Sequence, residues 1–176
     1  MTRTALLTLF LAASSVPALA QHRHAPAASR YAGFERREVK ALSDQQVADL
    51  KAGRGMGYAL PAELNGYPGP SHVLELGEHL GLTEAQRRRM QDLLDAMKAE
   101  TIPIGERLIA QETDLDRLFS GRTATTANLT AATATIGATQ AALRTAHLKY
   151  HVATVDTLTT EQVRRYGELR GYFGGQ

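Results

Sequence analysis

Two histidines in the C-terminal half of the chain, His147 and His151, have the spacing of a metal-chelating pair. In a helix, residues four apart lie about 40° from each other around the axis, with Cβ atoms about 5–6 Å apart. Two imidazoles at that separation can share one divalent ion, and zinc, nickel and copper all suit imidazole nitrogen. The spacing therefore predicts a site for a divalent transition metal, with two of its ligands on one helix.

A second histidine-bearing segment offers the remaining ligands. His72 and His79 are seven residues apart, about 20° around a helix axis, and Glu75 flanks the same face. If this segment packs on the helix with the histidine pair, His72 or His79 together with Glu75 would complete the site, and Glu63 is another candidate. The competing interpretation is that these histidines are surface or core-edge side chains with ordinary hydrogen bonds.

Composition excludes several other kinds of chemistry. The 176 residues contain no cysteine, which excludes a disulfide framework, a thiol nucleophile and a cysteine-based zinc or iron–sulfur site. Nothing orders Ser, His and Asp into a triad, and an H-x-x-x-H pair without the glutamate of H-E-x-x-H is not a metalloprotease motif, so we expect no enzymatic activity. A net charge of +2 without a basic stripe argues against a nucleic-acid partner.

The first 20 residues have the features of a cleaved secretory signal peptide. A single charge precedes a short apolar run, and Ala18-Leu19-Ala20 forms an A-x-A cleavage site. The run is too short to span a bilayer, which takes about 20 residues, and no later segment approaches that length. A secreted chain without cysteine fits a bacterial periplasm. We therefore expect a periplasmic protein with no membrane span and a small, polar, disordered tail over 21–33.

Three segments begin alike, each with Leu, a hydroxyl residue, two further residues and then Gln: residues 42–46, 82–86 and 158–162. This is the pattern of a capping box, in which the Ser or Thr hydroxyl accepts from the N3 amide and the Gln side chain reaches back to the cap amide. The preceding Leu suits a hydrophobic staple. The pattern predicts helices that start near residues 44, 84 and 160.

The helix that starts near residue 84 is the longest. Its apolar seam keeps its phase across Pro103, which predicts a kink and not a break; the seam consists of Met90, Leu94, Met97, Thr101, Ile104, Leu108, Gln111, Leu115 and Leu118. After a turn over 121–128, a second long helix should run to about residue 157, and two such helices fold back as an antiparallel hairpin. Their seams are thin and interrupted by polar residues, so we expect a second copy of the chain to complete the core as a homodimer.

The segment 53–70 contains five glycines and three prolines. It favours an irregular, flexible connector with a short helical turn near 58–64, or alternatively a sticky surface loop that displays Tyr58 and Tyr67. A short helix over 71–80 should follow. The expected fold is thus all-α, with a long antiparallel hairpin and shorter N-terminal helices in a single domain over 34–176.

These features resemble the periplasmic LTxxQ family, which includes the Spy/CpxP-like refolding chaperones and related heavy-metal resistance sensors. The motifs are Leu82-Thr83-Glu84-Ala85-Gln86 and Leu158-Thr159-Thr160-Glu161-Gln162, and the resemblance covers most of residues 42–172. It implies a helical hairpin that dimerises into a cradle-like bundle. The metal-sensing branch uses helical histidine pairs and an N-terminal histidine cluster, to which His147/His151 and His22/His24 are similar in kind. The chain departs from the family pattern in its 53–70 insert and in having His at both positions of its C-terminal pair.

Two functional hypotheses follow. The first is a metal-binding, metal-responsive periplasmic protein, in which metal at the histidine pair changes helix packing and an inner-membrane signalling partner reads the change. The alternative is a Spy/CpxP-like refolding chaperone or envelope-stress regulator that holds unfolded protein clients without metal. The helical histidine pair favours the first, and the thin seams with the Tyr/Pro/Gly segment favour the second.

Overall fold

The computed structural model describes residues 29–172 and divides the chain into two units, Met1–Ala32 and Gly33–Gln176. The described part of the first unit, residues 29–32, forms a turn closed by a hydrogen bond from the Ala32 amide to the Ser29 carbonyl. The predicted signal peptide, most of the predicted tail, and His22 and His24 lie outside the described residues.

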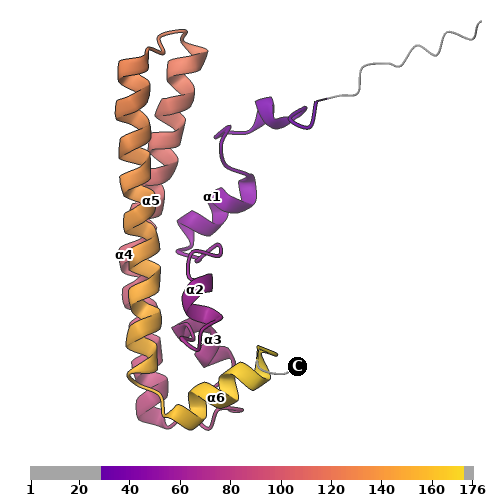
Figure 1. Cartoon of the computed structure of the whole chain (residues 1–176), viewed down its shortest axis with the longest axis vertical. Helices are drawn as coiled ribbons and strands as arrows, with labels where there is room; N and C mark the ends of the chain where they lie inside the picture. The colour runs from indigo at the N-terminus through magenta and orange to yellow at the C-terminus, as the bar shows by residue number, and fades with distance from the viewer. Residues whose placement is uncertain (1–28, 173–176) are drawn as a thin grey trace, which may run out of the picture. The chain divides into compact units, whose positions relative to one another are not determined.

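The described part of the second unit is helical, and no strand occurs between residues 29 and 172. A single 3-10 turn, η1, is followed by six α-helices: η1 (Phe34–Arg36), α1 (Asp44–Lys51), α2 (Leu60–Glu63), α3 (Pro70–Glu75), α4 (Glu84–Ser120), α5 (Thr126–Val155) and α6 (Thr160–Leu169). The two long helices, α4 and α5, pack against each other as an antiparallel hairpin, and α1 to α3 lie in succession along it (Figure 1). The predicted all-α fold and its hairpin are confirmed, whereas the homodimer stays a prediction. No helix of the described part is both long and apolar enough to cross a membrane.

All three predicted capping boxes are present. The Ser43, Thr83 and Thr159 hydroxyls each accept from the amide three residues on, and the Gln at that position accepts from the cap amide in return. A fourth box was not predicted, because Asn128 fills the position that Gln fills elsewhere. The Thr125 amide donates to Asn128 Oδ1 at 2.7 Å, so α5 begins at Thr126 and the predicted turn over 121–128 is shorter than expected.

The predicted helix over 71–80 is also shorter, because α3 ends at Glu75 and gives way to turns. Gly77 is a weak helix former, and it lies directly under the Arg87 guanidinium, where a Cβ atom would lie 3.0 Å from Nη1. In contrast, α4 continues through Pro103 as one helix, so the predicted absence of a break is confirmed, whereas the kink stays a prediction.

The second and third Leu-Thr-x-x-Gln motifs face each other through their glutamines. Gln86 Nε2 donates to Gln162 Oε1 at 2.8 Å, and Gln162 Nε2 donates to Gln86 Oε1 at 3.1 Å. Gln86 Nε2 also donates to the Thr157 carbonyl at 3.1 Å. The same side chains that cap α4 and α6 therefore join the starts of these helices, which fixes α6 at the open end of the hairpin.

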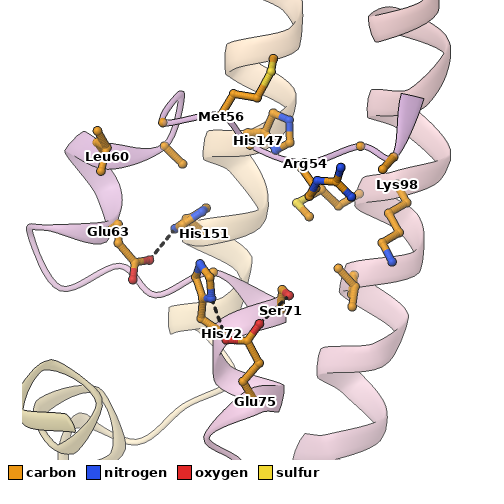
Figure 2. A pocket seen from close by; sticks show the side chains of 18 residues that line it. Arg54, Met56, Leu60, Glu63, Ser71, His72, Glu75, Lys98, His147 and His151 are labelled. Atoms are coloured by element: carbon orange, nitrogen blue, oxygen red, sulfur yellow. Dashed lines mark hydrogen bonds and ion pairs between the residues drawn. The ribbon is translucent and has the colours of Figure 1, made fainter. Parts of the chain in front are cut away.

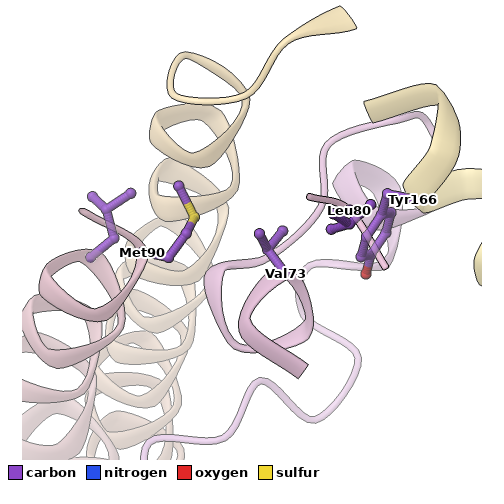
Figure 3. Close-up of a cluster of buried hydrophobic side chains, with 5 residues drawn as sticks. Val73, Leu80, Met90 and Tyr166 are labelled. Carbon is purple, nitrogen blue, oxygen red and sulfur yellow. The ribbon is translucent and has the colours of Figure 1, made fainter. Parts of the chain in front are cut away.

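Among residues 29–172, the buried apolar side chains form two clusters. One joins α3, α4 and α6 and contains Val73, Leu80, Met90, Leu93 and Tyr166 (Figure 3). The other joins α1 to the middle of the hairpin and contains Leu50, Leu108, Ile136 and Leu143. At the second cluster Gly105 allows α1 to approach closely, since a Cβ atom there would lie 2.7 Å from the Leu50 carbonyl oxygen.

The buried face of α4 drifts from the predicted seam along the helix. Met90, Met97, Thr101 and Leu108 are buried as predicted, but Leu93, Gly105 and Glu112 are buried in place of Leu94, Ile104 and Gln111. The predicted Leu115 and Leu118 are half-buried. A spacing of alternating four and three residues has a period of 3.5, whereas an α-helix has 3.6 residues per turn. The buried line therefore moves forward by about 0.2 residue per heptad, or about half a residue over two to three heptads, which accounts for the shift at Gly105 and Glu112.

A candidate metal centre beneath the glycine-rich segment

The segment 53–70 lies over the C-terminal part of α5 and is held there by close contacts. Gly69 lies against the His151 ring, where a Cβ atom would come within 2.9 Å of Cε1 and Nε2. Gly55 lies near His147 in the same way, with 3.6 Å from a Cβ position to Nδ1. The absence of side chains at these two glycines lets the backbone come down onto the two imidazoles.

A cavity of about 350 Å³ lies between this segment, α3 and the hairpin (Figure 2). All four predicted site residues line it, together with Glu63 and the cations Arg54 and Lys98; the four are His72, Glu75, His147 and His151. His79 does not line the cavity and is exposed. The topology thus brings together the two helical segments that the sequence analysis singled out.

One ring nitrogen of His151 is hydrogen-bonded to the backbone, and the other is available to bind a metal ion. Its Nδ1 lies 2.6 Å from the Tyr67 carbonyl oxygen, which can only accept a hydrogen bond. The proton of a neutral ring therefore belongs on Nδ1, which leaves the Nε2 lone pair free. Metal-binding histidines commonly have this arrangement, with the second nitrogen donating to a backbone carbonyl.

His147 is 2% exposed, and its buried Nε2 atom has no hydrogen-bond partner. The Tyr58 ring stacks on the imidazole with centroids 6.3 Å apart. Burial lowers the pKa of His147 below its ordinary value of 6.5, and His151 nearby lowers it further. The ring is therefore neutral at physiological pH, which is the form that binds a metal ion.

Glu63 brings a carboxylate from α2 to the same place. Its Oε1 accepts hydrogen bonds from the hydroxyls of Tyr166 and Tyr172, the latter at 3.0 Å. Its Oε2 is buried without a hydrogen-bond partner and lies 3.8 Å from His151 Nδ1. Figure 2 shows Glu63 and His151 pointing toward each other from α2 and α5.

His72 and Glu75 stand nearer the rim of the cavity. His72 Nδ1 and Glu75 Oε2 are 3.0 Å apart on successive turns of α3. Both side chains are more exposed than those of the α5 pair, so their interaction with each other is readily exchanged for another ligand.

Within residues 29–172, no three His, Asp or Glu side chains are already gathered closely enough to hold a metal ion. The donor set nevertheless fits a divalent transition metal. Imidazole nitrogen and carboxylate oxygen are suitable ligands, and two of the buried donor atoms, His147 Nε2 and Glu63 Oε2, have no other partner. Buried polar atoms in native proteins are nearly always paired, so two such atoms at one cavity need an explanation.

From the sequence, Glu63 ranks below Glu75 as a ligand, and no pattern singles out Tyr166, Tyr172 or Gly69. No local signal marks the two tyrosines, because they lie 103 and 109 residues from Glu63 along the chain. The glycines of the segment were visible as a group. Only the structure shows which of them touch imidazole.

A comparison with family models matches residues 59–165 to the heavy-metal resistance family. The chain belongs to this family. The match spans more than half of the sequence and includes α2, the hairpin and both imidazoles of the α5 pair, which agrees with the resemblance carried by the LTxxQ motifs. No curated protein and no solved structure matches the chain.

Proposed function

We propose that this protein is a periplasmic metal-binding protein of the sensor or resistance type, with Glu63, His147 and His151 as the inner ligands. The observation that carries the proposal is the pair of buried, unpartnered donor atoms, His147 Nε2 and Glu63 Oε2, at one cavity. The family match supports the same reading. His72 and Glu75 at the rim supply the outer ligands.

The residues have distinct roles in this proposal. His147 and His151 donate lone pairs from adjacent turns of one rigid helix, so their separation is set by helix geometry. The Tyr67 carbonyl orients the His151 ring, and Glu63 adds negative charge that compensates a divalent cation. A bound ion contributes charge neutralisation among these groups and a link between α2, α3 and α5.

That link makes the protein metal-responsive. The ligands belong to three helices, and α2 and α3 are short and contact α5 directly. Ligands from all three helices would hold the segment 53–75 more firmly on the hairpin, which would change a surface that a partner can recognise. An inner-membrane signalling protein is the partner we propose, and a homodimer is the assembly.

Calorimetric titration of the untagged protein with Zn²⁺, Ni²⁺ and Cu²⁺ tests the metal site. His147→Ala and His151→Ala should each remove most of the affinity, whereas the matched control His79→Ala, at an exposed histidine outside the cavity, should leave it unchanged. Affinity should fall at about pH 5.5 relative to about pH 7.5, because protons compete for the same nitrogens. No binding by the wild type, or full affinity in the doubly substituted variant, would overturn the metal-binding proposal.

The chaperone alternative has an observation of its own. Leu60, Leu64 and Tyr67, all on the segment 53–70, are large apolar side chains with about half of their surface exposed. An exposed apolar group on a connecting segment suits contact with unfolded clients. If this alternative holds, Leu60→Ser with Leu64→Ser should weaken suppression of aggregation of a heat-unfolded test protein, and Val152→Ser, at an equally exposed apolar residue on α5, should not.

A further inference from the structure

The C-terminal helix reaches the candidate metal centre through two tyrosine hydroxyls. Tyr166, on α6, donates to Glu63 Oε1, and Tyr172, just after the helix, donates to the same oxygen at 3.0 Å. Arg170 Nε lies 3.9 Å from that oxygen as well. One carboxylate oxygen is thus bound entirely to the C-terminal part of the chain, while the other is left for the cavity.

We propose that Tyr166 and Tyr172 are positioning residues that hold the Glu63 carboxylate for metal, and that α6 is therefore the element that reports whether the site is filled. This inference rests on the proposed function and extends it to the route by which occupancy is transmitted. Neither tyrosine lines the cavity itself, so both act through Glu63.

Geometry explains why two hydroxyls suit this task. A carboxylate with both oxygens free can rotate about its terminal torsion, which has broad minima. Two donors on Oε1 fix the plane of the group and leave Oε2 without a hydrogen-bond partner beside the His151 ring. Oε2 lies 3.8 Å from Nδ1, the nitrogen that donates to Tyr67, and the free Nε2 belongs to the same ring. Tyr166 is 1% exposed and its ring packs in the cluster of Figure 3, so its hydroxyl is itself held firmly.

Through the same hydrogen bonds, metal bound by Glu63 should affect α6. Metal binding by Glu63 should in turn strengthen the hold of the two hydroxyls on its Oε1 atom, and so change how α6 is held. The glutamine pair Gln86 and Gln162 fixes the start of α6 on α4, so the change is concentrated in its later residues. Coupling of this kind is reciprocal, because loss of the hydroxyls must change metal affinity by the same factor by which metal changes their binding to Glu63.

Phenylalanine substitutions test the inference while keeping the ring packing. Tyr166→Phe and Tyr172→Phe should each lower Zn²⁺ or Ni²⁺ affinity about tenfold or more, the usual cost of removing a group that orients a metal ligand. The matched control is Tyr150→Phe, which removes the hydroxyl of a half-buried tyrosine that packs on the same cluster as Tyr166 but donates to Glu100, at 3.0 Å, and does not line the cavity. That variant should bind metal as the wild type does.

Hydrogen exchange supplies a second readout that a merely structural role would not move. Metal should alter the protection of amides in residues 160–172 of the wild type and of Tyr150→Phe, and this response should be reduced in Tyr166→Phe. Wild-type metal affinity in both Tyr166→Phe and Tyr172→Phe, with metal bound normally by the wild type, would overturn this inference alone. No metal binding by the wild type would overturn the proposed function and this inference together.

Discussion

The first ten and the last ten residues of α5 belong to one helix but have different surroundings. None of residues 126–135 is buried, whereas Ala146, His147, His151 and Thr154 are buried among the last ten. The early stretch lacks charge, and no charged residue occurs between Arg122 and Arg144. The late stretch contains polar and ionisable groups and is nevertheless the better covered.

The difference lies in what covers each stretch. The glycine-rich segment, α2 and α3 lie on the last turns of α5, while the first turns have α4 as their neighbour. Polarity of the helix itself is therefore a poor guide to burial in this protein. A functional site arises where an irregular segment covers polar residues, and the uncovered, charge-free stretch is the face on which we expect a second copy of the chain.

The two ends of the hairpin should differ most in the unfolding free energy lost when an aromatic side chain is replaced by alanine. Tyr166→Ala removes a ring that is 1% exposed and leaves Glu63 without one of its donors, which should cost about 3–5 kcal/mol of unfolding free energy. Phe119→Ala, near the turn, removes a ring that is 58% exposed and should change stability by about 0.5 kcal/mol or less. Urea denaturation measures both. A large loss for Phe119→Ala would mean that the turn end is covered by another copy of the chain.

Glycine-to-alanine substitutions sharpen the contrast and should act in opposite directions. In Gly69→Ala the new methyl group meets the His151 ring at 2.9 Å, which should cost about 1–3 kcal/mol and weaken metal binding. Gly137, on α5, has open space at its Cβ position, so Gly137→Ala should stabilise the helix by about 1 kcal/mol. Thermal melts at two protein concentrations check both. Destabilisation by Gly137→Ala would show that this face is packed in the assembly.

The difference between the regular hairpin and the irregular segment 53–70 also explains which features could be predicted from the sequence. The helices of the hairpin, the three predicted capping boxes and the choice of the histidine pair as candidate ligands followed from local rules, since helix periodicity and capping depend on residues three and four apart. The course of the segment 53–70 did not, because its placement depends on which glycines touch His147 and His151. The link from Glu63 to Tyr166 joins residues 103 positions apart, and no short-range pattern encodes it.

The fourth capping box, formed by Thr125 and Asn128, lies inside the segment 121–128 that was predicted to be a turn. It leads to a prediction about stability with a smaller effect. Thr125 would have no cap partner if the turn ran to residue 128, and Thr83→Ala would then be the more harmful change. With Asn128 as its partner, Thr125→Ala should cost about 0.5–2 kcal/mol, similar to Thr83→Ala. Denaturation midpoints of the two variants make the comparison. An unaffected Thr125→Ala variant would indicate that the start of α5 frays in solution.

The finest distinction between the two ends lies in the pH dependence of the metal-free protein. Burial, with a contribution from His151, lowers the pKa of His147 below 6.5, so the unfolded chain takes up a proton at this residue before the folded chain does. The unfolding free energy should therefore fall as pH falls from about 6.5 toward the pKa of the folded state.

Glu112, on the part of α4 toward the turn, should act with the opposite sign. Burial raises the pKa of this carboxyl above 4.5, so the folded chain keeps the proton to a higher pH than the unfolded chain. Its contribution to the unfolding free energy should fall as pH rises from about 4.5 through the folded-state pKa. Glu112→Gln should consequently gain stability relative to the wild type as pH rises through this window. His147→Gln should gain relative to the wild type as pH falls below about 6.5. Urea midpoints of the three proteins between about pH 4 and pH 7.5 separate the two groups, and a pH-independent difference for either variant would contradict the burial assigned to that residue.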